Sequence, residues 1–293
     1  MFFGSIPALV TPFSRGSVAE DTFRELVEWQ VAEGSNALVP CGTTGEVATL
    51  SRDEHRHVVA TTVEAAAGRV PVIAGCGSYS TEASIEMIRA AADVGADAAL
   101  VVVPYYNRPS QAGLAAHFNA VAEASPLPII VYNVPSRTVA DISVETLAEV
   151  ARHPRIVGIK DATGNIGRGL ELLKAVPQDF AVYSGDDATA LALMLCGGAG
   201  NVSVTANVAP RAMHEMCVAA MNRDIGRAIE INNRLLGLNS KLFVEPNPVP
   251  VKWALAEMGM MPAGLRLPLA PLSAQFHETV RGAMREAGVS LKS

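Results

Sequence analysis

The sequence has 293 residues, of which 49% are hydrophobic and 18% are charged, and its formal net charge is -6 at pH 7. This length and hydrophobic content provide enough core for one large domain or two ordinary ones. The negative charge and the lack of a Lys/Arg-rich run argue against a nucleic-acid partner, and no run of about 18 apolar residues predicts a membrane span.

The chain begins with the apolar stretch MFFGSIPALVTPF, residues 1–13. It lacks the basic region of a signal peptide and is interrupted by Pro7 and Pro12, so we interpret it as the first strand. The cysteines are far apart and form no CxxC pair: Cys41, Cys76, Cys196 and Cys217. Because free thiols are the usual state in a reducing compartment, we expect a cytoplasmic protein.

Short apolar runs then recur along the chain: IPALV (6–10), NALVP (36–40), VPVIAG (70–75), AALVVV (98–103), PIIVYN (128–133), RIVGIK (155–160), FAVYSG (180–185) and NVSV (201–204). The runs are nearly continuous rather than alternating, which is typical of parallel strands covered on both faces. Their starts lie roughly 20–35 residues apart, the size of one βα unit. The pattern therefore predicts a parallel sheet with a helix after each strand.

Helical patterns fill the intervals between these runs. Residues 22–34 place apolar side chains on one face and end on a glycine. The pattern at 51–68 begins with Ser51 and has Glu54 three residues later, which predicts a capping box. Residues 80–95 repeat the scheme and also end on a glycine. Each of these segments is predicted to be one helix of a βα unit.

The repeated units favour a closed (β/α)8 TIM barrel over a doubly wound sheet, because they are similar in size and the runs above number eight. After about residue 224 the pattern becomes helical only. We therefore predict a catalytic barrel over residues 1–224 and a helical C-terminal extension over residues 225–293. The Pro-rich segment EPNPVP (245–250) is interpreted as a structured connector within that extension.

In this class of barrel the catalytic groups lie at the C-terminal ends of the strands. Those ends carry the following segments: CGTTGE (41–46), PYYNRPS (104–110), YNVPSRT (132–138), Lys160-Asp161, SGDD (184–187) and SVTANV (203–208). They contain no histidine and no carboxylate cluster, which argues against metal-dependent hydrolysis. His55 and His57 are two residues apart and should point to different faces of a solvated helix. The sequence also lacks GxSxG and GxxxxGK[ST], and GCGSYS (75–80) is only a weak dinucleotide signal.

The amine of Lys160 is the leading candidate for chemistry, because it ends an apolar strand. A free lysine is almost fully protonated at neutral pH, whereas attack on a ketone requires the neutral amine. Burial in an apolar barrel mouth would favour that neutral form. Strand alternation should point Asp161 away from Lys160, so we expect no ion pair between them. The other lysines fall on predicted helices or the tail and lack this setting: Lys174, Lys241, Lys252 and Lys292.

Several motifs, taken together and in order, resemble the dihydrodipicolinate synthase / N-acetylneuraminate lyase family of pyruvate-dependent, Schiff-base-forming lyases: GTTGE (42–46), PYYNRPSQ (104–111), YNVPSRT (132–138) and GIKDATGN (158–165). The segment KLFVEPNPVPVKWAL (241–255) is similar to the synthase branch of that family. The resemblance runs from Gly4 to about Gly288. It implies condensation of pyruvate with L-aspartate-4-semialdehyde to 4-hydroxy-tetrahydrodipicolinate, which begins lysine and diaminopimelate biosynthesis, with no metal and no organic cofactor.

The resemblance also implies a role for each site residue. Lys160 would form the imine with pyruvate, and Tyr132 would shuttle protons, linked through Thr43 to Tyr106. Family members supply that last tyrosine across a subunit contact, which implies a dimer within a homotetramer. Tyr106 has a simpler alternative as a packing aromatic, and Thr43 and Thr44 have one as caps before a helix.

The remaining implied residues bind substrate. Thr44 and its backbone N–H, at the start of a helix, would hold the pyruvate carboxylate. Arg137 would bind the carboxylate of the semialdehyde, with a structural salt bridge as its alternative. Gly185 and Val202 would line the pyruvate pocket. The carboxylates Glu46, Asp186 and Asp187 are interpreted as structural.

The sequence departs from the family at the positions that bind inhibitory lysine in sensitive members: Val47, Arg52, Tyr79 and Ala83. Val47 and Tyr79 remove polar partners for a charged amino acid, so weak or absent feedback by lysine is predicted.

Two other functions remain open. The first is a related lyase that acts on sialic acid or on a keto-deoxy sugar acid, although a sugar polyol would not need the carboxylate-binding Arg137. The second is a catalytically silent barrel that binds a keto acid.

Overall fold

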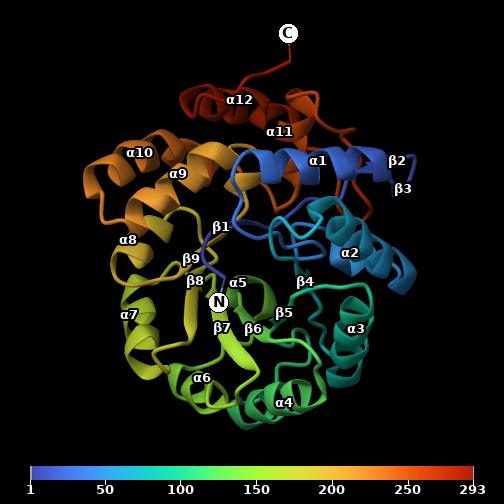
Figure 1. The fold of residues 1–293 in the computed structure, drawn as a ribbon. Helices are drawn as coiled ribbons and strands as arrows, with labels where there is room; N and C mark the ends of the chain where they lie inside the picture. The colour runs from blue at the N-terminus through green and yellow to red at the C-terminus, as the bar shows by residue number, and fades with distance from the viewer. Residues whose placement is uncertain (1, 293) are drawn as a thin grey trace.

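The computed structural model describes residues 2–292 and shows helices arranged around a group of parallel strands (Figure 1). Its strands are β1 (Gly4–Pro7), β2 (Phe13–Ser14), β3 (Ser17–Val18), β4 (Ile73–Gly75), β5 (Ala98–Val102), β6 (Ile129–Asn133), β7 (Ile156–Asp161), β8 (Ala181–Ser184) and β9 (Gly200–Ser203).

The α-helices are α1 (Glu20–Ala32), α2 (Arg52–Ala66), α3 (Thr81–Asp93), α4 (Gln111–Ala124), α5 (Pro135–Thr138), α6 (Val144–Val150), α7 (Ile166–Ala175), α8 (Ala190–Leu195), α9 (Pro210–Met221), α10 (Ile225–Lys241), α11 (Val249–Glu257) and α12 (His277–Glu286). The 3-10 helices are η1 (Val47–Thr49), η2 (Thr205–Asn207) and η3 (Ala274–Phe276). The α/β alternation of the predicted units is therefore present.

The main sheet has seven parallel strands in the order β1-β9-β8-β7-β6-β5-β4. The remaining predicted run, 36–40, is the second in chain order and lies between the two outer strands of this sheet. It is joined to them by isolated bridges, Ala8 with Val39 and Leu38 with Val72, rather than by a continuous ladder. The structure is thus a parallel sheet curled as a half-barrel, with the segment 36–40 hydrogen-bonded on both sides.

The continuous apolar character of the strands follows from burial on both faces of the sheet. In β6, Ile129 and Val131 belong to the apolar cluster under the surrounding helices. Ile130 and Tyr132 alternate with them and belong to a cluster that also draws on β1, β4, β5, β8 and β9. Neighbouring residues along one strand therefore pack into different apolar clusters. Because both faces of the strand are covered, apolar and polar residues do not alternate along it.

The first helices begin close to the predicted residues. Ser51 and Glu54 form the predicted capping box at the start of α2, with the Glu54 N–H donating to the Ser51 hydroxyl at 3.1 Å. His57 lies on the exposed side of α2 and contacts Glu20 at 2.8 Å. The prediction of a solvated surface was wrong for His55, which is 3% exposed and has its Nε2 at 2.7 Å from the Gly75 carbonyl. Burial lowers the pKa of His55.

The C-terminal part packs as a helical group beside the strands. A separate apolar cluster joins α9 to α10, α11 and α12. Between residues 2 and 292 no strand follows β9. These helices gather at one edge of the molecule, in the orange-to-red part of the ribbon (Figure 1).

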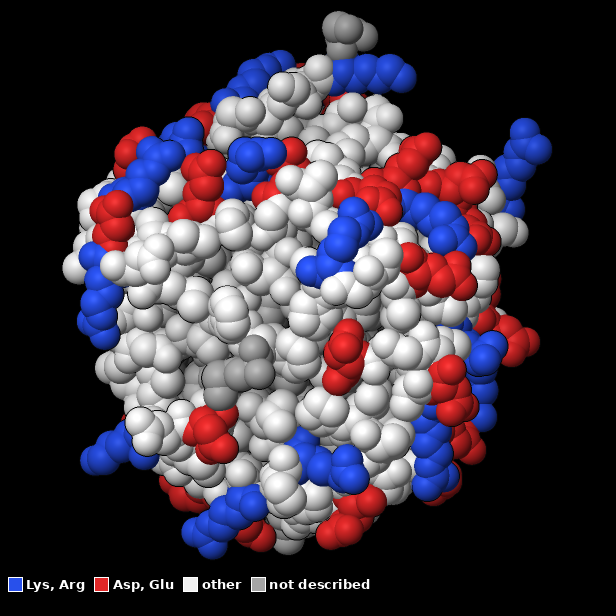
Figure 2. Space-filling model, in the orientation of Figure 1, with Lys and Arg blue, Asp and Glu red and all other residues white. Residues whose placement is uncertain are grey.

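Charged side chains of both signs are interspersed over the face seen in Figure 2, mainly toward its periphery. No helix in the described part of the chain combines the length and the hydropathy needed to cross a bilayer.

Candidate active site

Lys160 lies near the C-terminal end of β7, between two tyrosine-bearing strands. The register pairs it with Tyr132 of β6 and with Tyr183 of β8. Its Nζ lies 4.3 Å from the centre of the Tyr132 ring. Lys160 is 5% exposed and Tyr132 is 8% exposed. The structure therefore brings the predicted amine and the predicted proton shuttle into contact in a largely enclosed position.

The neighbouring carboxylate faces the other way. Asp161 accepts hydrogen bonds from Arg168 Nε at 2.8 Å and from Asn133 Nδ2 at 3.3 Å. Among residues 2–292, no carboxylate forms an ion pair with Lys160, whereas Asp161 pairs with Arg168. The prediction that strand alternation separates Lys160 from Asp161 is confirmed.

Gly185 forms a wall of the space occupied by Lys160. A Cβ atom added at Gly185 would lie 2.8 Å from Lys160 Cε and 2.8 Å from the Cβ of Ala162. The Gly185 N–H donates to the Asp161 carbonyl at 2.7 Å. This hydrogen bond fixes the Gly185 backbone close to the Lys160 side chain. Val202 of β9 is buried in the same apolar cluster as Tyr132. Gly185 and Val202 thus lie on the same side of the sheet as the candidate amine.

The threonines lie on a tight turn after the segment 36–40. The Gly45 N–H donates to the Gly42 carbonyl at 3.0 Å, and the Glu46 N–H donates to the Thr43 carbonyl at 3.1 Å. Thr44 was predicted at the start of a helix, but the only helix nearby is the three-residue η1, which begins at Val47. Thr44 is 2% exposed. Its surroundings are therefore set by this turn rather than by a helix N-terminus.

Asn247 connects the turn to Arg137, and the sequence did not single it out. Its Nδ2 donates to the Thr44 hydroxyl at 2.9 Å, and its carbonyl accepts from Arg137 Nη2 at 3.1 Å. Asn247 is 6% exposed. The only sequence signal for it is its place in the Pro-rich connector, which was predicted to be structured. The connector thus links two predicted substrate-binding residues, Thr44 and Arg137, in one hydrogen-bond network.

A cavity of about 360 Å³ opens beside these residues. It lies where the 43–49 segment, α5 and the connector meet, and its lining includes Thr43, Tyr105, Arg137, Asn247 and Leu269. The space is large enough for a small organic acid, and it carries both a hydroxyl and a guanidinium for that acid to contact.

Tyr106 is a predicted site residue that does not line this cavity. Its side chain is 92% exposed. Its backbone has a φ of 70°, in the left-handed region that non-glycine residues seldom adopt. Within one chain, therefore, Tyr106 is held outward in a strained conformation instead of being packed against Tyr132.

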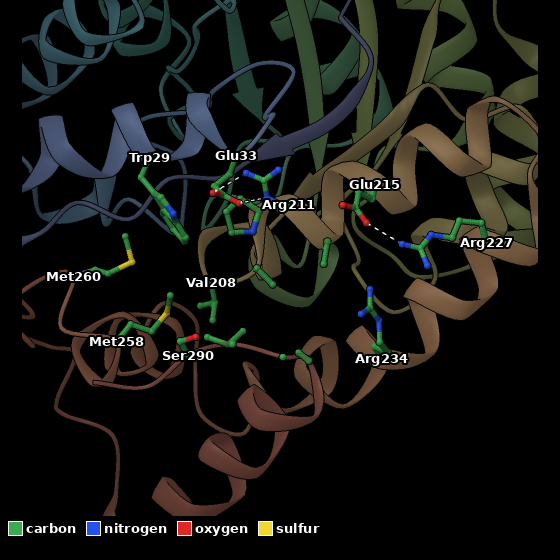
Figure 3. Close-up of a pocket in the computed structure, with 16 residues that line it drawn as sticks. Trp29, Glu33, Val208, Arg211, Glu215, Arg227, Arg234, Met258, Met260 and Ser290 are labelled. Carbon is green, nitrogen blue, oxygen red and sulfur yellow. Dashed lines mark hydrogen bonds and ion pairs between the residues drawn. The ribbon is translucent and has the colours of Figure 1, made fainter. Parts of the chain in front are cut away.

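A larger cavity, of about 610 Å³, lies between α1, α9, α10 and the chain's C-terminal end (Figure 3). Four of its five charged residues form two ion pairs, Arg211 with Glu33 at 2.8 Å and Arg227 with Glu215 at 3.2 Å, and Arg234 is the fifth. None of the predicted site residues lines it. Between residues 2 and 292, no cluster of three His, Cys, Asp or Glu residues could hold a metal ion.

The model of the dihydrodipicolinate synthetase family matches residues 1–287. The chain is similar to the 4-hydroxy-tetrahydrodipicolinate synthase of Herminiimonas arsenicoxydans, with 56% identity over 290 residues that cover 99% of both proteins. It is similar to the enzyme of the same name from Nitrosomonas europaea, with 56% identity and coverage of 99% of this chain and all of that protein. Its fold resembles the chloride-inhibited dihydrodipicolinate synthase of Acinetobacter baumannii, crystallised with pyruvate, with a TM-score of 0.97, 50% identity and coverage of 99% of this chain and 100% of that one.

Proposed function

Because the chain belongs to the dihydrodipicolinate synthetase family, we propose that it condenses pyruvate with L-aspartate-4-semialdehyde to 4-hydroxy-tetrahydrodipicolinate. The observation that carries this proposal is the setting of Lys160, which is 5% exposed and lies against Tyr132. An enclosed amine without an acid partner suits nucleophilic attack on a ketone. This reaction is a committed step toward diaminopimelate and lysine.

The chemistry follows from the amine. Lys160 adds to the C2 carbonyl of pyruvate, and loss of water leaves an imine. Removal of a proton from the pyruvate methyl group gives an enamine, whose carbon attacks the aldehyde carbon of the second substrate. The amino group of that substrate then attacks the imine carbon, closes the ring and releases Lys160. Tyr132 lies beside Lys160 and is the group we assign to move protons in these steps.

The carboxylates of the two substrates need separate anchors. We assign the pyruvate carboxylate to Thr44 and the N–H groups of its turn, and the semialdehyde carboxylate to Arg137. Arg137 lines the 360 Å³ cavity, where a planar guanidinium is suited to bidentate recognition of a carboxylate. Gly185 and Val202 would line the pyruvate side. This use of Arg137 favours an amino-acid aldehyde over the polyol of a sugar acid.

A second copy of the chain would complete the site. Tyr106 is exposed in one chain, and we propose that it enters the partner's site and joins the relay through Thr43 to Tyr132. The dimer formed in this way would be half of a homotetramer. The exposure and left-handed backbone of Tyr106 support this assignment, because strained residues persist where they serve a function.

We also propose that the segment 36–40 is the eighth strand of a closed (β/α)8 barrel over residues 1–224. It carries backbone hydrogen bonds toward both outer strands, including Val39 N–H to Pro7 O at 3.0 Å and Ile73 N–H to Leu38 O at 2.8 Å. Residues 225–293 would then be the helical extension. Free cysteines at all four positions suit a cytoplasmic location.

The decisive experiment is a borohydride trap followed by an activity assay. Reduction in the presence of pyruvate should add one pyruvate-derived group to the protein, located at Lys160 by peptide mass mapping. Coupled turnover should then require both pyruvate and L-aspartate-4-semialdehyde. Cleavage of a sialic or keto-deoxy-sugar acid without semialdehyde turnover would identify a related lyase. A protein that borohydride leaves unmodified would instead be a silent keto-acid-binding barrel.

Feedback by lysine is expected to be weak or absent. Val47 and Arg52 line a small cavity of about 170 Å³ next to η1, and neither side chain suits a cationic amino acid. Arg52 is cationic and pairs with Glu86 at 2.5 Å, while the Tyr79 ring packs edge-on against Tyr105 with centroids 5.5 Å apart. Each lost polar partner costs about 1–3 kcal/mol, so the loss of two should weaken lysine binding by roughly 30-fold or more relative to sensitive members.

The measurement is a lysine titration of the coupled assay at fixed pyruvate. A double variant, Val47→Ser with Tyr79→Asn, should increase sensitivity to lysine. Half-inhibition of the unmodified protein at the low concentrations that inhibit sensitive members would contradict this prediction.

A further inference from the structure

A buried ion pair holds the end of the turn that carries Thr43 and Thr44, beside the 360 Å³ cavity that Glu46 also lines. It joins Glu46, the last residue of that turn, to Lys252 of α11, and each of the two side chains is 1% exposed. We propose that this pair is a positioning device, which fixes the 42–46 turn and so sets the affinity of the pyruvate carboxylate site. The inference rests on the proposed function, because that function assigns the carboxylate to Thr44.

Lys252 is tied to the turn through two routes. Its Nζ donates directly to the Glu46 carboxylate. It also donates to the Thr11 carbonyl at 2.8 Å, and the Thr11 hydroxyl donates to the Gly45 carbonyl at 2.8 Å. The amine of Lys252 therefore holds two consecutive residues of the turn, one directly and one through Thr11.

Arg266 adds a third connection from the C-terminal part. Its backbone N–H donates to the second oxygen of Glu46 at 3.1 Å. Its guanidinium donates to the Thr49 carbonyl at 2.8 Å and lies 4.3 Å from the centre of the Phe13 ring. Lys252 Nζ lies 4.4 Å from the centre of the same ring. Both cations thus lie over the Phe13 ring, and each oxygen of the Glu46 carboxylate accepts a hydrogen bond, one from Lys252 and one from Arg266.

Stability alone does not explain this pair. Burying two charges removes both from water, and apolar residues of similar size commonly give a fold that is equally stable or more stable. Glu46 also has a φ of 56°, a left-handed conformation that costs energy for a side chain with a Cβ. A conformation of this kind persists only when its surroundings fix it. The ion pair, Thr11 and Arg266 supply that constraint at the turn that bears the threonines.

The test removes both charges together, in the double variant Glu46→Gln with Lys252→Met. The pyruvate concentration that gives half-maximal borohydride trapping should rise roughly tenfold, equivalent to about 1.4 kcal/mol of binding. The KM for the semialdehyde should rise less than the pyruvate concentration does, because the two substitutions remove neither α5, which carries Arg137, nor the hydrogen bond from Arg137 to the Asn247 carbonyl. A structural role alone would lower the melting temperature and leave both concentrations unchanged.

A matched control is the double variant Glu257→Gln with Arg281→Met. This ion pair also lies in the C-terminal part, with 2.7 Å between Arg281 Nε and Glu257, and both partners are about equally exposed at 28% and 29%. It should leave the half-saturating pyruvate concentration unchanged. An unchanged value in the Glu46/Lys252 variant as well would overturn the proposal.

A milder variant keeps the proposal open to refutation if the double variant does not fold. Thr11→Val keeps the shape and both charges and removes only the hydroxyl that holds Gly45. It should raise the half-saturating pyruvate concentration roughly threefold, and no rise would count against positioning. Trapping needs no second substrate. Absent turnover with the semialdehyde would therefore contradict the proposed function, while the trapping comparison would still decide the role of the pair.

Discussion

Lys160→Met should lower kcat/KM by roughly 10³-fold or more, because no other group can then form the imine on which every later step depends. Methionine has a similar length and lacks the amine. The free energy of unfolding should not fall, since Lys160 has no carboxylate partner to lose within residues 2–292. Borohydride and pyruvate should no longer add a group to the protein. Mass mapping, steady-state kinetics and thermal unfolding of the same preparation measure all three quantities.

Lys174→Met is the matched control, because Lys174 is exposed on α7. It should keep full activity and full trapping. If Lys160→Met still trapped pyruvate, the imine would form at another lysine, and Lys252 is the other buried one. Burial lowers the pKa of Lys252, but the adjacent Glu46 carboxylate opposes that shift. Lys252 also donates to both Glu46 and Thr11, which favours its charged form, so we expect no adduct there.

The burial of Lys252 could not be predicted from the sequence. The segment PVPVKWAL reads as a helix, and a lysine on a helix is ordinarily solvated. The partner that makes its burial possible, Glu46, lies 206 positions away in the chain. The order of residues alone does not indicate a contact between side chains so far apart in the sequence. From residue order alone, Lys252 is therefore placed on a helix outside any buried setting, and Glu46 is interpreted as structural with no partner assigned.

The parts predicted well were those set by local chemistry. Apolar runs predicted β5 to β9 to within a few residues, because strands covered on both faces need continuous apolar character. Strand alternation predicted that Lys160 and Asp161 face opposite ways. The β2–β3 hairpin was missed, since each of its strands has only two residues and too short a pattern to detect. Thr44 was misplaced at a helix start because a Gly-flanked turn and a helix cap use the same residues.

Gly185→Ala should lower kcat/KM by roughly 10²-fold, because a shift of about 1 Å in a catalytic group costs that much. The new Cβ would lie 2.8 Å from both Lys160 Cε and Ala162 Cβ, closer than such carbons approach. Lys160 is the more flexible neighbour, so the amine is expected to move away from Tyr132. Overpacking should also cost about 1–3 kcal/mol of unfolding free energy. Trapping rates at pyruvate concentrations well below saturation measure the first effect, and denaturant unfolding measures the second.

Gly282→Ala is the control for this substitution. Gly282 lies within α12 and a Cβ there meets nothing within 4 Å. Alanine should leave activity unchanged and raise the unfolding free energy by about 0.5–1 kcal/mol, because it favours the helix. If Gly185→Ala kept the trapping rate of the parent, Lys160 would tolerate displacement by a methyl group. The amine would then be positioned by its own strand and Tyr132, and the close approach of Gly185 would be a packing feature without catalytic effect.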